Sequence, residues 1–144
     1  MPTSPDDAVR SGPRTLLRLE GAVGFCALTA AYPWSGHSWW LFGALFFVPD
    51  LSMLTYLVNT RVGAAGYNAA HTFIGPGLLG GAGFLLGSPL LPWSAVIWAA
   101  HIGFDRMIGY GLKYSSGFGY THLGTLGATN SAPESRSRIR FCRA

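Results

Sequence analysis

Four side chains that can bind metal ions or transfer protons stand in otherwise apolar stretches of the sequence. They are Asp50, His71, His101 and Asp105. His101 and Asp105 are four residues apart and therefore share one face of a helix. Two imidazoles and two carboxylates form a plausible set of ligands for a divalent metal ion. The same set offers candidate catalytic groups, His71, His101 and Asp105, with one histidine as a general base.

The elements that hold these side chains are best explained as membrane helices. Of the 144 residues, 49% are hydrophobic and 11% are charged, and the mean hydropathy is +0.30. Soluble domains carry about 25% charged residues. Between Glu20 and Asp105 the only formal charges are Asp50 and Arg61. The chain lacks the charge to cover a water-facing surface, so we expect lipid to cover most of it.

Four segments approach the roughly 20 apolar residues that a spanning helix needs. We expect spans at about 15–34, 38–58, 61–86 and 90–112. The predicted fold class is therefore all-α, an integral membrane four-helix bundle that occupies residues 15–124. Residues 1–14 are expected to form a flexible N-terminal segment, and residues 125–144 a disordered basic tail. A homo-oligomer is a reasonable expectation, because four helices are few for a transporter.

Basic side chains predict the orientation of these spans. They flank the start of the first span, lie between the second and third, and follow the fourth, at Arg10, Arg14, Arg18, Arg61 and Lys113. The other two connections contain no lysine or arginine. The positive-inside rule then places both termini in the cytoplasm. Tryptophans near the other two connections would form an outer aromatic belt, namely Trp34, Trp39, Trp40 and Trp93. We expect a multi-pass protein of the inner (plasma) membrane.

Helix geometry places the four polar side chains at a common depth. At 1.5 Å per residue, Asp50 lies roughly 12 Å and His71 roughly 15 Å above the cytoplasmic ends of their spans. His101 and Asp105 lie roughly 16 Å and 10 Å above the end of theirs. Asn68 is one turn below His71 and faces the same way. We therefore expect these side chains to converge in one polar layer.

A second set of charged side chains is expected at the cytoplasmic edge of this layer. It consists of Arg18, Glu20, Arg106 and Lys113. Its cations would hold a phosphate or a lipid headgroup. His122 would either return to the same edge or remain a solvated loop histidine, and the second is the more common situation. Pro49 and Pro76 would each open the helical hydrogen-bond ladder near the layer.

Three classes of function remain open. An aspartate at the bilayer centre costs at least about 2.5–3.5 kcal/mol, so it needs a partner, a proton or a cation. The first class is a cation- or metal-dependent membrane enzyme that acts on a lipid-type phosphate. The second is a small transporter or cation-binding module. The third is a structural protein whose polar layer sets helix register, with Asp50 paired to a histidine or Arg18, and Asp105 to Arg61 or Arg106.

Other classes of function have less support. Two histidines on adjacent helices are also compatible with haem, but one such pair is weak evidence. Cys26 and Cys142 stand in a predicted span and in the tail, so we expect neither a disulfide nor a zinc motif. The basic residues lie at the ends of the chain rather than on a folded face, so nucleic-acid binding is not expected. Asp6 and Asp7 argue against a cleaved signal peptide.

Five stretches of the sequence carry a resemblance to a known family. They are LLRLEG (16–21), VPDLSMLTY (48–56), RVGAAGYNAAHTFIGP (61–76), AHIGFDRMIGYGLKY (100–114) and THLG (121–124). Over about 16–124 the chain resembles the bacterial membrane family called domain of unknown function 4260. The resemblance implies a small multi-span membrane protein and supplies no reaction. The segment YSSGFGYTHLGTLG departs from the family pattern, in which this linker is more charged.

A second, weaker likeness concerns the four polar side chains themselves. PDLS, a later histidine and HIGFD are similar to the PDLD, His, H-x-x-x-D layout of inner-membrane metal-dependent hydrolases. In this likeness Asp50 matches the first acid, and His71, His101 and Asp105 match the later ligands. Ser52 stands where the layout has its second acid, so one implied ligand is missing.

Overall fold

The computed structural model describes residues 11–113, 120–121 and 124–125. The fold is all-α, as predicted. Its helices are α1 (Ser11–Ala31), α2 (Trp39–Phe46), α3 (Thr60–Ala70), α4 (Ile74–Leu85) and α5 (Leu90–Ile108), with 3₁₀ helices η2 (Tyr32–Ser35) and η3 (Pro49–Leu57). A two-residue strand pair, β1 (Tyr120–Thr121) and β2 (Gly124–Thr125), is antiparallel and was not predicted.

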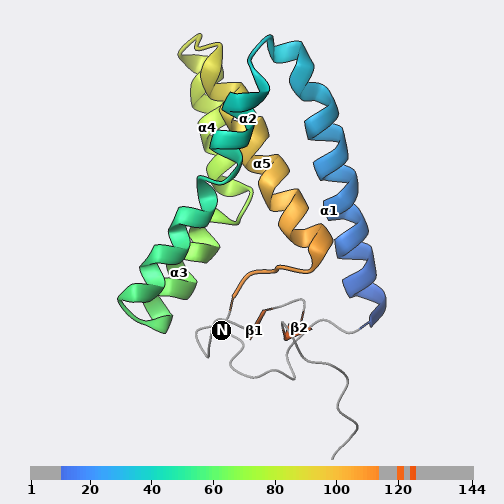
Figure 1. Ribbon diagram of the computed structural model, residues 1–144, viewed down its shortest axis with the longest axis vertical. Helices are drawn as coiled ribbons and strands as arrows, with labels where there is room; N and C mark the ends of the chain where they lie inside the picture. Colours follow the sequence, from blue (N-terminus) through green and yellow to red (C-terminus); the bar gives the residue numbers. More distant parts are fainter. Residues whose placement is uncertain (1–10, 114–119, 122–123, 126–144) are drawn as a thin grey trace, which may run out of the picture.

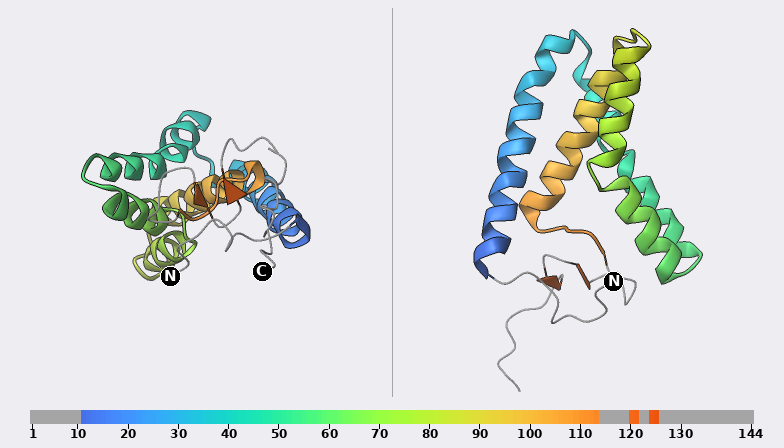
Figure 2. Two further views of the ribbon diagram at one scale, coloured as in Figure 1. Left: turned by 90° about the horizontal axis from the view of Figure 1, so that it is seen from below. Right: turned by 180° about the vertical axis from the view of Figure 1, so that it is seen from behind.

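The chain runs back and forth along one direction (Figure 1). It rises through α1, descends through α2 and η3, rises again through α3 and α4, and descends through α5. The start of α1, the η3–α3 turn and the end of α5 therefore lie towards one end, and the other two connections lie at the opposite end. Helix α5 packs against α1, α4 and α2, while η3 pairs with α3 in a leg that diverges from α1 (Figure 2).

Two glycines bring the backbones of α1 and α5 together. A Cβ atom on Gly21 would lie 2.8 Å from the carbonyl oxygen of Gly103. A Cβ atom on Gly103 would lie 2.9 Å from the backbone nitrogen of Phe25. Only glycine allows this approach, which is the helix-packing device common in membranes.

An aromatic core lies beside the polar layer. Tyr32, Phe46, Ile97 and Ala100 are buried together between α1, α2 and α5. The ring of Phe46 also meets the His101 imidazole edge to face, with centroids 5.1 Å apart. The core thus fixes the position of α5 at the level of His101.

The second predicted span, 38–58, is not one continuous α-helix. Helix α2 ends at Phe46, and the 3₁₀ helix η3 begins at Pro49. Proline has no N–H group and its ring clashes with the carbonyl four residues earlier, so it cannot continue the α-helical ladder. The chain changes to three-residue bonds here, with Asp50 N–H donating to the Phe47 carbonyl. This change positions Asp50 at the start of η3.

The third predicted span, 61–86, is also divided. Helix α3 ends at Ala70, His71 caps it with φ −110° and ψ 20°, and α4 begins at Ile74. Pro76 occupies the first turn of α4, where its missing N–H removes no helical bond. The interruption predicted near the prolines therefore lies directly at His71.

The outer limits of the predicted segments need smaller corrections. Helix α1 begins at Ser11, so residues 11–14 are helical rather than part of a flexible segment, and α5 ends at Ile108 rather than near 112. Among the described residues, one helical stretch, Trp39–Leu57, is long and apolar enough to cross a membrane. Residues 1–10, His122 and the predicted tail from residue 126 onward, including Cys142, lie outside the described part of the chain.

Candidate metal centre

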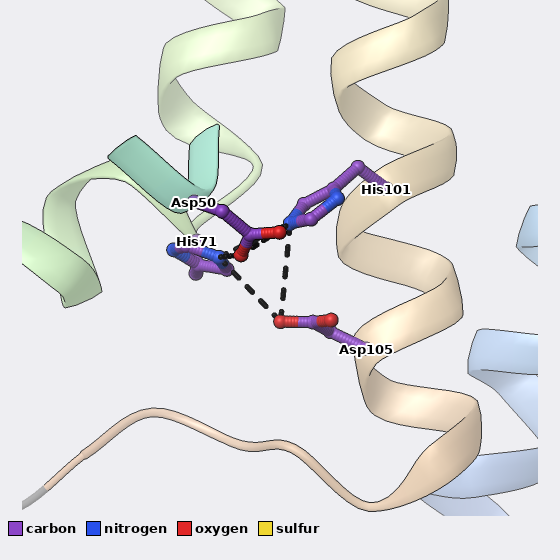
Figure 3. Close-up of side chains that lie close together, drawn as sticks. All are labelled: Asp50, His71, His101 and Asp105. Carbon is purple, nitrogen blue, oxygen red and sulfur yellow. Dashed lines mark hydrogen bonds and ion pairs between the residues drawn. The ribbon is translucent and has the colours of Figure 1, made fainter. Parts of the chain in front are cut away.

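The four side chains predicted to converge do so (Figure 3). Asp50 comes from the start of η3, His71 from the end of α3, and His101 and Asp105 from adjacent turns of α5. Each offers one ligand atom, and these atoms all lie within 4.8 Å of one another. The geometric part of the site prediction is therefore confirmed, whereas its chemical role is a proposal below.

Five of the six separations among these atoms are close to the edges of a metal coordination shell. The two Nε2 atoms are 3.2 Å apart. His71 Nε2 lies 3.7 Å from Asp50 Oδ1 and 3.5 Å from Asp105 Oδ2. His101 Nε2 lies 3.5 Å and 3.9 Å from the same two oxygens. Ligands about 2.0–2.2 Å from a tetrahedral ion lie about 3.3–3.6 Å from one another. An ion therefore fits between the four side chains with small adjustments.

A backbone hydrogen bond fixes the tautomer of His71. Its Nδ1 lies 2.8 Å from the carbonyl oxygen of Tyr67. A carbonyl only accepts, so Nδ1 carries the hydrogen, and neutral His71 presents the lone pair of Nε2 to the cluster. Metal-binding histidines are usually oriented by this kind of bond from the other ring nitrogen.

Tyr67 is a residue of the site that sequence reasoning missed. Its hydroxyl donates to Asp105 Oδ2 at 2.9 Å. Its ring stacks on the His71 imidazole with centroids 3.7 Å apart and an interplanar angle of 11°. The side chain is completely buried. The available signal was its i, i+4 spacing to His71, which predicts a shared helix face. Tyr67 orients two of the four side chains.

His101 is held mainly by packing. It is buried against Phe46, and its ring meets that of His71 at an interplanar angle of 62°. The backbone of Phe46 lies close to the imidazole of His101. Even so, within the described residues Nδ1 of His101 forms no hydrogen bond of acceptable geometry. His101 therefore depends less on an orienting hydrogen bond than His71 does.

Exposure differs sharply among the four side chains. His71, His101 and Asp105 are 3%, 2% and 12% exposed, whereas Asp50 is 34% exposed. Three of the four side chains are thus buried, and Asp50 is the part of the cluster that is accessible from outside. Approach to the centre from outside is therefore expected on the side of η3.

Asn68, on helix α3, is hydrogen-bonded to the segment that follows α5. Its Oδ1 accepts from the backbone N–H of Lys113 at 2.7 Å, and its Nδ2 donates to the Lys113 carbonyl at 2.9 Å. These two bonds anchor Lys113 to α3, whereas the sequence placed Asn68 in the polar layer with His71. The isolated bridge between Lys113 and Thr121 extends this connection towards β1.

The ammonium group of Lys113 lies among aromatic rings. Its Nζ is 4.5 Å from the centre of the Tyr67 ring, with Tyr56 and Tyr110 at 5.8 Å and 5.9 Å. Burial lowers the pKa of Lys113 to about 8, against the opposing attraction of Asp105 and Asp50. The side chain thus adds positive charge beside the cluster at neutral pH.

The other predicted edge residues lie apart from the four-residue cluster. Arg18 donates from Nε to the Met107 carbonyl at 2.9 Å and so caps α5. The Arg106 guanidinium lies 4.5 Å above the ring of Phe73 and interacts electrostatically with Glu20. Within the described residues, neither arginine makes the ion pairs with Asp50 or Asp105 considered from the sequence. Arg18, Glu20 and Arg106 instead link the ends of α1 and α5.

Comparison with known proteins places the chain in a family. The family model described as domain of unknown function (DUF4260) matches residues 14–126, a span that includes all four residues of the cluster. The chain belongs to this family. Membership predicted from the sequence stretches is thereby confirmed. No match was found among curated proteins or among solved structures. The family description names no activity, so inference about function depends on the site.

Proposed function

We propose that the protein is a multi-pass membrane metalloprotein whose centre is formed by Asp50, His71, His101 and Asp105. Two observations support its membrane environment. Large apolar side chains are exposed on every long element, among them Leu16, Val23, Trp40, Leu57, Val62, Phe84 and Ile108. The stretch Trp39–Leu57 also has the length and hydropathy of a span. Apolar surface of this extent suits lipid rather than water.

The proposed orientation puts both termini in the cytoplasm of the inner membrane. Arg14, Arg61 and Lys113 belong to segments at one end of the molecule (Figure 1). Trp34 and Trp40 are exposed near the first connection at the opposite end. This separation of positive charge and tryptophan is the pattern of the positive-inside rule and the aromatic belt.

The mutual distances of the four ligand atoms are the observation that carries the metal proposal. Two carboxylates balance the charge of a divalent ion, and mixed imidazole and carboxylate ligands suit zinc, iron or manganese. The His71 tautomer and the Tyr67 hydrogen bond also hold two ligands in the orientation that a metal requires. A bound ion would remove the cost of burying two aspartates in an apolar medium.

The accessibility of Asp50 favours a catalytic centre over a purely structural one. Structural sites are closed by their protein ligands, whereas catalytic sites keep a position that substrate or water can reach. Asp50 is the most exposed of the four ligands, so water or a substrate oxygen could reach the ion on that side as an additional ligand. A metal ion in such a position polarises a phosphoryl or carbonyl oxygen and activates water. We therefore propose a metal-dependent membrane enzyme.

Elemental analysis of the purified protein tests the metal proposal. We expect one zinc, iron or manganese ion per wild-type chain, and background levels in His101→Ala and Asp105→Asn. His37→Ala, which removes a histidine near the α1–α2 connection, should retain the metal. The proposal fails if the wild type contains no more metal than His101→Ala.

The accessible position can be tested with Co²⁺ as a spectroscopic probe. The visible spectrum of the Co²⁺ protein should shift when inorganic phosphate is added, because an anion can enter at the side of Asp50. An unchanged spectrum, with Co²⁺ bound, would instead indicate a closed structural site.

A further inference from the structure

An apolar groove adjoins the proposed metal centre. It has a volume of about 300 Å³, at the lower end of the range for small-molecule pockets. Leu45 lines it from α2, Leu79 from α4, and Ser94 and Trp98 from α5. Helices α2, α4 and α5 thus each contribute to its wall. The groove is a hollow between helices that the described side chains leave unfilled, and it opens to the surface beside the exposed Val48.

The groove and the centre share three stretches of chain. Pro49, Ala70 and Trp98 line the groove. Pro49 precedes Asp50, Ala70 precedes His71, and Trp98 is one turn before His101 on the same face of α5. The indole N–H of Trp98 donates to the Ala70 carbonyl at 2.7 Å, which ties α5 to α3 at this junction. None of the four cluster side chains lines the groove itself, but a ligand in the groove would have one end next to the residues that carry them.

The groove extends mainly in one direction from the level of the centre, and of its lining residues only Ser52 and Ala70 lie on the other side. Leu45 precedes Asp50 on the descending chain, Leu79 follows His71 on the rising chain, and Ser94 precedes His101 on the descending α5. All three positions are displaced towards the connections at 36–38 and 87–89. In the proposed orientation, a chain in the groove points away from the cytoplasm. A lipid of the cytoplasmic leaflet has its headgroup and chain in this same order.

The charge of the metal-loaded centre favours an anionic headgroup. Asp50 and Asp105 would balance a divalent ion, and Lys113 adds a positive charge within electrostatic range of both carboxylates. Ser52 supplies a polar atom on the groove wall: its Oγ is buried and has no hydrogen-bond partner among the described residues. A phosphate oxygen would satisfy this hydroxyl, which is costly to leave unpaired in an apolar medium.

We propose that the centre binds the phosphate of a single-chain amphiphile, a monoalkyl phosphate, whose chain lies in the groove between α2 and α4. This inference rests on the proposed metal centre and names its substrate class. Inside a bilayer the chain gains little from leaving the surrounding lipid. The groove therefore orients the ligand, while the metal and Lys113 provide the attraction for its headgroup.

Photolabelling in phosphatidylcholine nanodiscs tests this arrangement. The probe is dodecyl phosphate with a diazirine at mid-chain, and the matched probe is dodecyltrimethylammonium with the same diazirine. With zinc loaded, the phosphate probe should label the peptides that contain Leu79 and Trp98. This labelling should be lost when a chelator removes the zinc. It should also be lost in Ser94→Leu, which places a larger side chain in the groove, and the ammonium probe should not give it.

A matched substitution controls for general effects on α5. Ala99 lines a separate hollow between α1, α4 and α5, so Ala99→Leu should keep the labelling. The inference is overturned if the two probes label these peptides equally, if chelation leaves the labelling unchanged, or if Ser94→Leu is labelled as strongly as the wild type. Each of these results would mean that bulk lipid, rather than a bound phosphate, fills the groove. Zinc content measured on the same samples separates the two failures. Bound zinc with zinc-independent labelling contradicts only this inference, whereas absent zinc contradicts the metal centre as well.

Discussion

The Nε2 atoms of His71 and His101 face each other at 3.2 Å, although the two residues are 30 positions apart in the sequence. A hydrogen bond between two imidazole nitrogens requires one donor and one acceptor. Both nitrogens also lie within 4.0 Å of the same two carboxylate oxygens. One divalent cation at the centre would satisfy both nitrogens and both oxygens. Without it, the four groups must share protons among themselves.

Metal binding is expected to stabilise the folded protein. The ligands come from η3, α3 and α5, so an intact site exists only when these elements are packed together. Zinc at about 100 times its dissociation constant should raise the free energy of unfolding by about 2.7 kcal/mol. Thermal unfolding in detergent, with zinc or with a chelator, measures this shift. His101→Ala should unfold at the same temperature under both conditions; a zinc-dependent increase in that variant would place the metal elsewhere.

Tyr67→Phe is expected to weaken metal binding while preserving the fold. The variant keeps the ring that stacks on His71 but loses the hydrogen bond to Asp105. Loss of an orienting partner typically lowers metal affinity by about 10–100-fold. Competition with a chromogenic chelator gives the dissociation constants. Tyr32→Phe, which removes a hydroxyl bonded to the Ser38 carbonyl at the α1–α2 connection, is the matched control and should bind as the wild type does. Equal affinity in both variants would exclude an orienting role for Tyr67.

Asn68→Ala is expected to release the segment after α5. The substitution leaves both backbone groups of Lys113 without their Asn68 partners, at a cost of about 1–3 kcal/mol for each buried group left unsatisfied. Hydrogen exchange at the Lys113 amide should become faster. Asn59→Ala removes the N-cap of α3 and costs about 1 kcal/mol, but it should leave that amide protected. Unchanged exchange in Asn68→Ala would show that other contacts hold the segment.

Lys113 predicts a specific dependence of stability on alkaline pH. The pKa of this amine is about 8 in the folded protein, against 10.5 for an ordinary lysine, because burial disfavours the charged form. Between these two values the unfolded chain binds the proton and the folded chain does not, so stability rises with pH. In chelator, the wild type should gain stability from pH 8 to pH 10.5 relative to Lys113→Met. Denaturant unfolding at the two pH values measures the difference, and parallel curves for the two proteins would contradict the lowered pKa.

The sequence predicted the convergence of the cluster because depth and helix face are simple functions of residue number. Asp50, His71, His101 and Asp105 fall at similar distances from the same end of their segments, and helical rise alone reveals this. Gly103 lies against Gly21, and glycine in an apolar helix is a recognised sign of close helix packing. Position along a helix is thus readable from an apolar sequence with few charges.

The breaks in the second and third segments were harder to locate. Pro49 and Pro76 indicated interruptions, but the hydropathy of both segments continues through them, so each was assigned as one span. The change to the 3₁₀ helix η3, and the cap at His71, depend on how the chain packs around the cluster. The role of Tyr67 was equally hidden, because a tyrosine in an apolar helix gives no sign of which partner its hydroxyl meets.

X-ray absorption spectroscopy of the metal-loaded protein tests the central claim most directly. With zinc bound, the four-residue cluster predicts a shell of nitrogen and oxygen atoms at about 2.0–2.2 Å, with the outer-shell scattering of two imidazoles. His71→Ala should lose the contribution of one imidazole. A shell without imidazole, or a spectrum that is identical in wild type and His71→Ala, would show that Asp50, His71, His101 and Asp105 do not form the metal site.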